Sequence, residues 1–149
     1  MKKTIVALWN NPNTGKTETL RALAEIIINN LTDLVPIFPI PLAVNQEDDF
    51  RLVVQINGRI IGIESQGDPN TNLLERLLEL VNDFNCDVII CATRLRGETV
   101  WAVENIHENF NYETIWTSTY QVSNPNIFQI SNRTKAEHLV DLLRILDLM

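Results

Sequence analysis

Residues 10–17 combine a glycine, a lysine and a threonine in a pattern that suits the binding of an anion. They read Asn-Asn-Pro-Asn-Thr-Gly-Lys-Thr, after an apolar run over 4–9 and at the start of a helical stripe. Gly15 permits a turn in which backbone N–H groups converge on an anion, and the helix that follows adds its N-terminal dipole. Lys16 can neutralise phosphate oxygens, and the Thr17 hydroxyl can bind Mg²⁺. These residues are therefore predicted to bind a phosphate group.

The stretch resembles the Walker A loop of the P-loop NTPase superfamily, G-x-x-x-x-G-K-[ST], with Asn10 in place of the first glycine. Asparagine is expected to be tolerated there because it adopts positive φ more easily than most residues. The alternative is a plain strand–turn–helix, which would place a lysine against the helix dipole to no advantage. The resemblance implies a nucleoside triphosphate bound by Asn10, Asn13, Thr14, Gly15, Lys16, Thr17 and Glu18.

A second motif follows a predicted hairpin, where Glu64 precedes Ser-Gln-Gly-Asp. The order of strand, loop, helix, connector, hairpin and acid-x-x-Gly resembles the first half of a Ras-type GTPase. The resemblance implies that Glu64 ends a strand beside the strand of the phosphate loop, holds Mg²⁺ together with Thr17, and that Gln66 positions water. The alternatives are that Glu64 emerges into solvent at a strand end and that Asp68 caps a helix.

Arg94 and Arg96 form a third candidate because they follow a buried strand over 87–93. Ligands of open α/β sheets bind at the carboxyl edge, and in extended chain both arginines would point the same way. They are predicted to contact phosphate or to stabilise charge on a transferring phosphoryl group. The alternative is a solvated pair. Asp48 and Asp49 are interpreted as a solvated turn or as a base for a hydroxyl acceptor.

Predicted strands and helices alternate along the chain and would position these residues. Asn57-Gly58 between two β-type runs, 51–56 and 59–64, predicts an antiparallel hairpin. Further strands are expected over 4–9, 87–93 and 114–120, and helices starting at Lys16, after Pro69, at Gly97 and at a Thr134-x-x-Glu137 capping box.

Two segments are harder to assign. Residues 32–49 are interpreted as a proline-rich, then acidic connector, and 126–130 as a short extended piece. That piece follows the strand at 114–120 too closely for a helical crossover, which needs about a dozen residues. Either 114–130 form a hairpin, or one of the two pieces is not a strand of the sheet.

The alternation predicts an α/β fold, with residues 1–149 as one P-loop nucleotide-binding domain. Two helical layers would cover a mostly parallel sheet of five or six strands. The hairpin would add one antiparallel strand, expected at an edge.

Composition limits the partners and the compartment. Twelve Lys and Arg against nineteen Asp and Glu give a net charge of −7, which argues against a nucleic-acid partner. The longest apolar run, 34–44, holds three prolines and is too short to cross a membrane. The N-terminus lacks a signal-peptide pattern, so a cytoplasmic protein is expected. Both cysteines, Cys86 and Cys91, and the three tryptophans are predicted to lie in the core.

These observations predict Mg²⁺-dependent nucleoside triphosphate binding, with hydrolysis or phosphoryl transfer to a small acceptor, as in an NTPase or kinase. The catalytic candidates are Lys16, Arg94 and Arg96. ATP is favoured over GTP by elimination, because the segment after 114–120 lacks an Asn-Lys-x-Asp guanine motif. Two alternatives remain open: a nucleotide-dependent switch that acts through a protein partner, and a degenerate member that binds without turnover.

Overall fold

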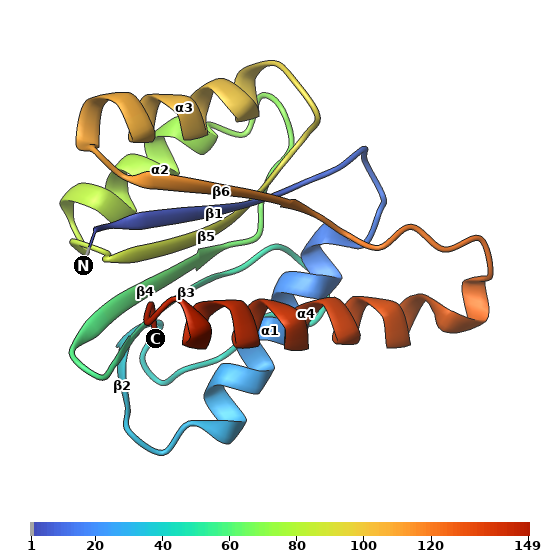
Figure 1. Ribbon diagram of the computed structural model, residues 1–149, viewed down its shortest axis with the longest axis horizontal. Coiled ribbons are helices and arrows are strands. Elements are labelled where there is room, and N and C mark those ends of the chain that lie inside the picture. The colour runs from blue at the N-terminus through green and yellow to red at the C-terminus, as the bar shows by residue number, and fades with distance from the viewer. Residues whose placement is uncertain (1) are drawn as a thin grey trace.

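The computed structural model describes residues 2–149 as one six-stranded mixed sheet with helices on both faces (Figure 1). The strand order is β2-β3-β4-β5-β1-β6. The strands are β1 (Thr4–Trp9), β2 (Leu34–Phe38), β3 (Arg51–Ile56), β4 (Arg59–Glu64), β5 (Val88–Thr93) and β6 (Glu113–Ser118). The helices are α1 (Lys16–Asn30), α2 (Leu73–Asn82), α3 (Glu98–Phe110) and α4 (Phe128–Ile145), with a short 3₁₀ turn at Pro125–Ile127.

The two strands with continuous apolar sequence, β1 and β5, pair with each other in parallel in the middle of the sheet. Both faces of these strands are buried, so no polar alternation is required of them. Alternate residues of the strands feed two hydrophobic clusters. One cluster contains the apolar faces of α1 and α4, and the other contains those of α2 and α3. The α/β fold and the mostly parallel sheet predicted from sequence are therefore confirmed.

The position of the hairpin was predicted wrongly. Strands β3 and β4 pair around Asn57-Gly58 as expected, but β3 lies inside the sheet because β2 pairs with it on its other side. Strand β2 comes from the segment interpreted as a connector, and it occupies the edge of the sheet. Pro36 has no N–H to donate and is tolerated there because an edge strand pairs on one side only.

The start of the last helix is a second correction. Residues 126–130 are not extended, since α4 begins at Phe128 after the 3₁₀ turn. The predicted capping threonine, Thr134, lies inside the helix and donates its hydroxyl to the Ile130 carbonyl. The strand before it ends at Ser118 and no hairpin forms, so the second alternative for 114–130 holds.

Of the remaining predictions, one is confirmed and others are wrong. Both cysteines are buried as free thiols. Trp101 and Trp116, in contrast, are 66% and 40% exposed, so their assignment to the core is wrong. Asp68 does not cap a helix, because α2 begins at Leu73 with Asn72 as its N-cap. Among residues 2–149, no helix has the length and apolar character needed to cross a membrane.

Four parallel strands, β1, β4, β5 and β6, end at the same edge of the sheet. The chain segments that follow them, which start at residues 10, 65, 94 and 119, therefore meet at this carboxyl edge.

Candidate functional site

The loop between β1 and α1 turns through two residues with positive φ. Asn13 has φ +57° and Gly15 has φ +80°. The Thr14 hydroxyl donates to the Asn11 carbonyl at 2.7 Å, and the Gly15 carbonyl accepts from the Thr19 N–H at 2.9 Å, which starts α1. Asn10 has no positive φ. The expectation that asparagine is tolerated at this position because it adopts positive φ easily is therefore wrong.

The Lys16 side chain lies folded against this loop and is only 7% exposed. Its ammonium donates to the carbonyl oxygens of Asn10 and Asn11 at 2.8 and 3.0 Å. The pKa of Lys16 is lowered from 10.5 to about 8, mainly by burial and in addition by the Arg94 guanidinium, while Asp68 opposes the shift. The loop therefore holds a desolvated cation at the start of a helix.

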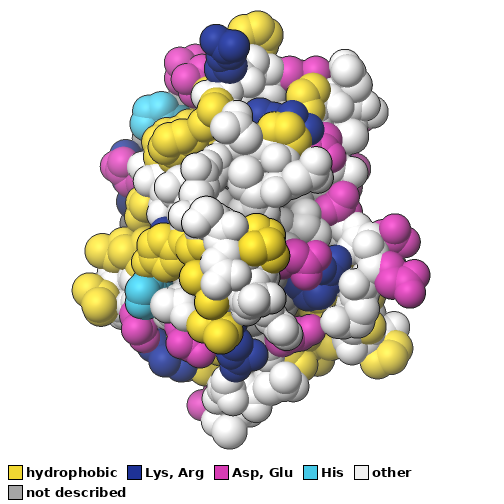
Figure 2. All heavy atoms as spheres, turned by 90° about the vertical axis from the view of Figure 1, so that its right-hand side faces the viewer, with side chains coloured by type: hydrophobic (Ala, Val, Ile, Leu, Met, Phe, Trp, Pro, Cys, Tyr) yellow, Lys and Arg dark blue, Asp and Glu magenta, His cyan; other side chains and the backbone are white. Residues whose placement is uncertain are grey.

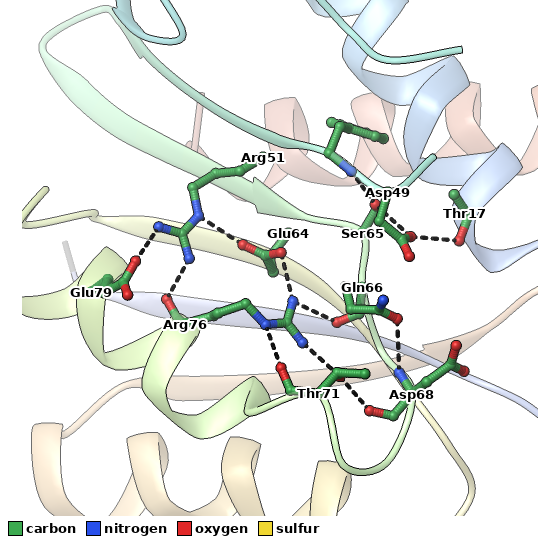
Figure 3. Close-up of polar contacts among 11 residues, drawn as sticks. Thr17, Asp49, Arg51, Glu64, Ser65, Gln66, Asp68, Thr71, Arg76 and Glu79 are labelled. Carbon is green, nitrogen blue, oxygen red and sulfur yellow. Dashed lines mark hydrogen bonds and ion pairs between the residues drawn. The ribbon is translucent and has the colours of Figure 1, made fainter. Parts of the chain in front are cut away.

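Thr17 has an acidic neighbour, Asp49, which the sequence predicts only as part of a solvated turn or as a base for a hydroxyl acceptor. Its hydroxyl donates to Asp49 Oδ1 at 3.3 Å, and Ser65 Oγ donates to the same oxygen at 2.9 Å (Figure 3). The Phe50 N–H donates to Ser65 Oγ at 2.8 Å, which fixes this hydroxyl. Asp49 stands just before β3, so the hairpin brings it to the loop.

Glu64 is occupied elsewhere. It is 4% exposed and pairs with Arg51 Nε at 2.7 Å and Arg76 Nη1 at 2.6 Å (Figure 3). Its strand β4 does not neighbour β1, because β5 lies between them, so the adjacency expected from the GTPase resemblance is wrong. A magnesium role for Glu64 stays a prediction that these contacts do not support.

The arginine that holds Glu64 also shapes the chain after β4. Arg76 donates to the Gln66 carbonyl at 3.0 Å, to the Thr71 carbonyl at 3.0 Å and to the Thr71 hydroxyl at 2.9 Å. Gly67 in this segment passes close to the end of β5, where a Cβ would meet the Ala92 carbonyl oxygen. The segment over 65–71 is therefore fixed from both sides.

The two candidate arginines do not act as a pair. Arg94 donates to Asp68 Oδ1 from Nη2 at 2.7 Å and from Nε at 3.2 Å. Strand β5 ends at Thr93 and the chain bends at 95–97, so the extended stretch expected to align both side chains is absent. Arg96 is exposed. Neither arginine lines the cleft beside the loop, but Arg94 is connected to that cleft through its ion pair with Asp68, which does line it.

A cleft of about 1000 Å³ opens beside the loop. Figure 2 views the end of the molecule to which the chain after β6 and the start of α4 project, with several hydrophobic patches on its surface. The cleft has three walls: the loop and first turn of α1, the segment Ser65–Asp68, and the chain after β6 with the start of α4. The third wall contributes Tyr120, Gln121, Val122, Phe128, Gln129, Ser131, Asn132 and Arg133.

The start of α4 reaches the loop itself. A Cβ on Gly15 would lie 2.5 Å from Asn132 Oδ1, the end of a side chain that can shift, so the glycine is needed chiefly for its positive φ. Glu18, predicted to bind the ligand, is 63% exposed in its side chain and pairs with Arg21 at 2.6 Å. Within residues 2–149, no group of three His, Cys, Asp or Glu side chains could hold a metal. A cation here would rely on few protein oxygens together with phosphate and water, which is the usual habit of Mg²⁺.

No protein-family model, curated protein or solved structure matches the chain.

The pH dependence of stability should report the burial of Lys16. Because its pKa falls from 10.5 to about 8 on folding, the unfolded chain binds more protons than the folded chain between these values. The contribution of Lys16 to the free energy of unfolding should rise as the pH increases from 8 to 10.5. In urea unfolding at pH 7, the free energy of unfolding of Lys16→Met should equal or exceed that of the parent. The difference between the two should shift in favour of the parent as the pH rises to 10.5. Parallel pH profiles for parent and variant would contradict the assignment.

Proposed function

We propose that this chain binds a Mg²⁺–nucleoside triphosphate, with ATP as the favoured nucleotide, in the cleft beside residues 10–17. The reaction is hydrolysis or phosphoryl transfer to a small acceptor. The observation that carries the proposal is the Lys16 ammonium, 7% exposed and bonded only to carbonyl oxygens of its own loop. A buried cation without a carboxylate partner is unfavourable, and an anion that enters the cleft relieves this.

The loop provides the other requirements of a phosphate site. Gly15 ends the loop at the start of α1, whose first N–H groups and dipole favour a negative charge. The strand–loop–helix arrangement and the Gly-Lys-Thr sequence agree with the resemblance to P-loop NTPases. Asn13 and Thr14 would offer backbone N–H groups to the phosphates, and Lys16 would bridge the terminal phosphate oxygens.

For magnesium we propose Thr17 with Asp49 as the acidic partner, in place of Glu64. Asp49 accepts from both Thr17 and Ser65, whereas Glu64 is neutralised by two guanidinium groups. Both hydroxyls donate to Asp49 Oδ1, so this carboxylate has lone pairs left for a hydrated cation.

Among the arginines, Arg94 is the stronger catalytic candidate. Its bond to Asp68, which lines the cleft, holds a guanidinium beside the cleft, where it could stabilise charge on a transferring phosphoryl group. Arg96 stays a candidate through its place at the carboxyl edge alone.

A nucleotide-dependent switch is the second candidate function. It is favoured by the Thr17–Asp49 contact, since Asp49 belongs to the irregular segment 39–50 between β2 and β3. A cation bound at Thr17 would replace this hydrogen bond and could reposition that segment for a protein partner. Hydrogen exchange over 39–50 that changes between ADP and ATP, with negligible turnover, would favour the switch over the enzyme.

The phosphate site is tested first through the lysine. Lys16→Ala should abolish stabilisation by Mg²⁺–ATP, because the variant lacks the ammonium that would pair with the ligand. This ammonium does not pair with residues of the core. Thermal-shift titration measures this, with Lys2→Ala as a control at an exposed surface lysine. A full shift in the Lys16 variant would place the ligand elsewhere.

The magnesium assignment separates two acids. Asp49→Asn should raise the Mg²⁺ concentration needed for half-maximal ATP stabilisation at least tenfold, because a neutral amide is a weaker ligand. The neighbouring exposed Asp48→Asn should leave it unchanged. If Glu64→Gln, and not Asp49→Asn, shifts the requirement in a variant that still unfolds cooperatively, the original prediction for Glu64 is correct.

The arginine assignment predicts an effect on rate. Arg94→Ala should lower turnover at saturating nucleotide at least tenfold with a modest change in affinity, because a guanidinium that acts in the transition state affects kcat more than binding. Arg96→Ala is the comparison and should have the smaller effect. Weaker binding with unchanged kcat would make Arg94 a ground-state phosphate clamp.

A further inference from the structure

Asn10, the residue that departs from the Walker A pattern, links the phosphate loop to the opposite wall of the cleft. Its amide Nδ2 donates to Thr119 Oγ1 at 2.8 Å. Its Oδ1 accepts from Gln121 Nε2 at 2.7 Å and from the Asn11 N–H at 2.8 Å. A glycine at this position could make none of these side-chain contacts.

The bond between Asn10 and Thr119 is protected from water. Asn10 is 3% exposed and Thr119 is 4% exposed. The partners lie 109 and 111 residues along the chain, so the amide joins segments that local structure would not hold together. The Asn10 N–H also donates to the Thr93 carbonyl at 3.3 Å, which adds the end of β5 to the junction.

The segment that Asn10 holds, residues 119–122, is the cleft wall with aromatic and amide character. Tyr120, Gln121 and Val122 line the cleft there, with Phe128 and Asn132 from α4 beside them. Tyr120 and Phe128 are 42% and 47% exposed, which leaves ring surface available to a ligand. The Tyr120 hydroxyl is bonded to His138 Nδ1 at 2.6 Å, so the ring itself is anchored to α4.

Flat aromatic faces beside side-chain amides suit a planar heterocycle that has both donors and acceptors on its edge. A nucleobase has this chemistry, whereas a phosphate chain does not.

We infer that Asn10 is a positioning residue that sets the 119–122 wall against the phosphate loop, so that this wall binds the nucleoside part of the ligand. The inference rests on the proposed function for the phosphate site. Lys16 and the loop bind the phosphates alone, and the extra affinity of a nucleotide over a bare phosphate chain comes from the wall. That extra affinity depends on the Asn10–Thr119 bond.

The test compares Kd for Mg²⁺–ATP and for Mg²⁺–tripolyphosphate by calorimetry. The parent should bind ATP at least tenfold more tightly than tripolyphosphate. Asn10→Gly and Thr119→Val should each reduce this ratio at least fivefold, with tripolyphosphate affinity changed less than threefold. Thr119→Ser keeps the accepting hydroxyl and should keep the ratio.

The matched control is Asn57→Gly, the same substitution at a positive-φ turn between β3 and β4, at the opposite edge of the sheet. It should leave both affinities unchanged. A ratio unaffected in both Asn10→Gly and Thr119→Val overturns the inference, as does an equal loss for the two ligands. Equal binding of ATP and tripolyphosphate by the parent overturns the inference but not the phosphate site, whereas binding of neither overturns both.

Discussion

The Lys16 ammonium is held against the carbonyl oxygens of Asn10 and Asn11, and the arrangement of the carboxyl edge follows from keeping a cation there. Hydrogen bonds to neutral carbonyls only partly replace hydration, so burial lowers the lysine pKa to about 8. Asp68 favours the charged form and Arg94 opposes it, and the two are bonded to each other at 2.7 Å. The loop therefore keeps its cation poised and incompletely compensated, which is a suitable state for receiving an anion.

A second charged network stabilises the framework around this site without belonging to it. Glu64 is buried between Arg51 and Arg76, which come from β3 and α2. Removing one partner of a buried ion pair costs about 3–5 kcal/mol, because a charge is left uncompensated. Arg76 also donates to the carbonyls of Gln66 and Thr71. The ion pair that holds Arg76 in place therefore also holds the segment from which Ser65 and Asp68 line the cleft.

Each segment at the edge is thus joined to the next by side chains and not by the sheet alone. Asp49 connects the chain before β3 to Thr17 and Ser65, and Asn10 connects the loop to Thr119 and Gln121. These contacts fix the irregular segments that form the walls of the cleft.

The elements that depend on residues close together in the chain could be predicted from the amino-acid sequence. The turn at Asn57-Gly58, the buried strands β1 and β5, and the strand–loop–helix at Lys16 follow from local backbone preference and periodicity. The sequence did not predict that β5 separates β4 from β1 or that Glu64 pairs with two arginines. Nor did it predict the hydrogen bonds that Asp49 and Asn10 make with residues far along the chain. Strand order and long-range side-chain pairing depend on how whole faces pack, and a periodic pattern is the same whichever neighbour a strand has.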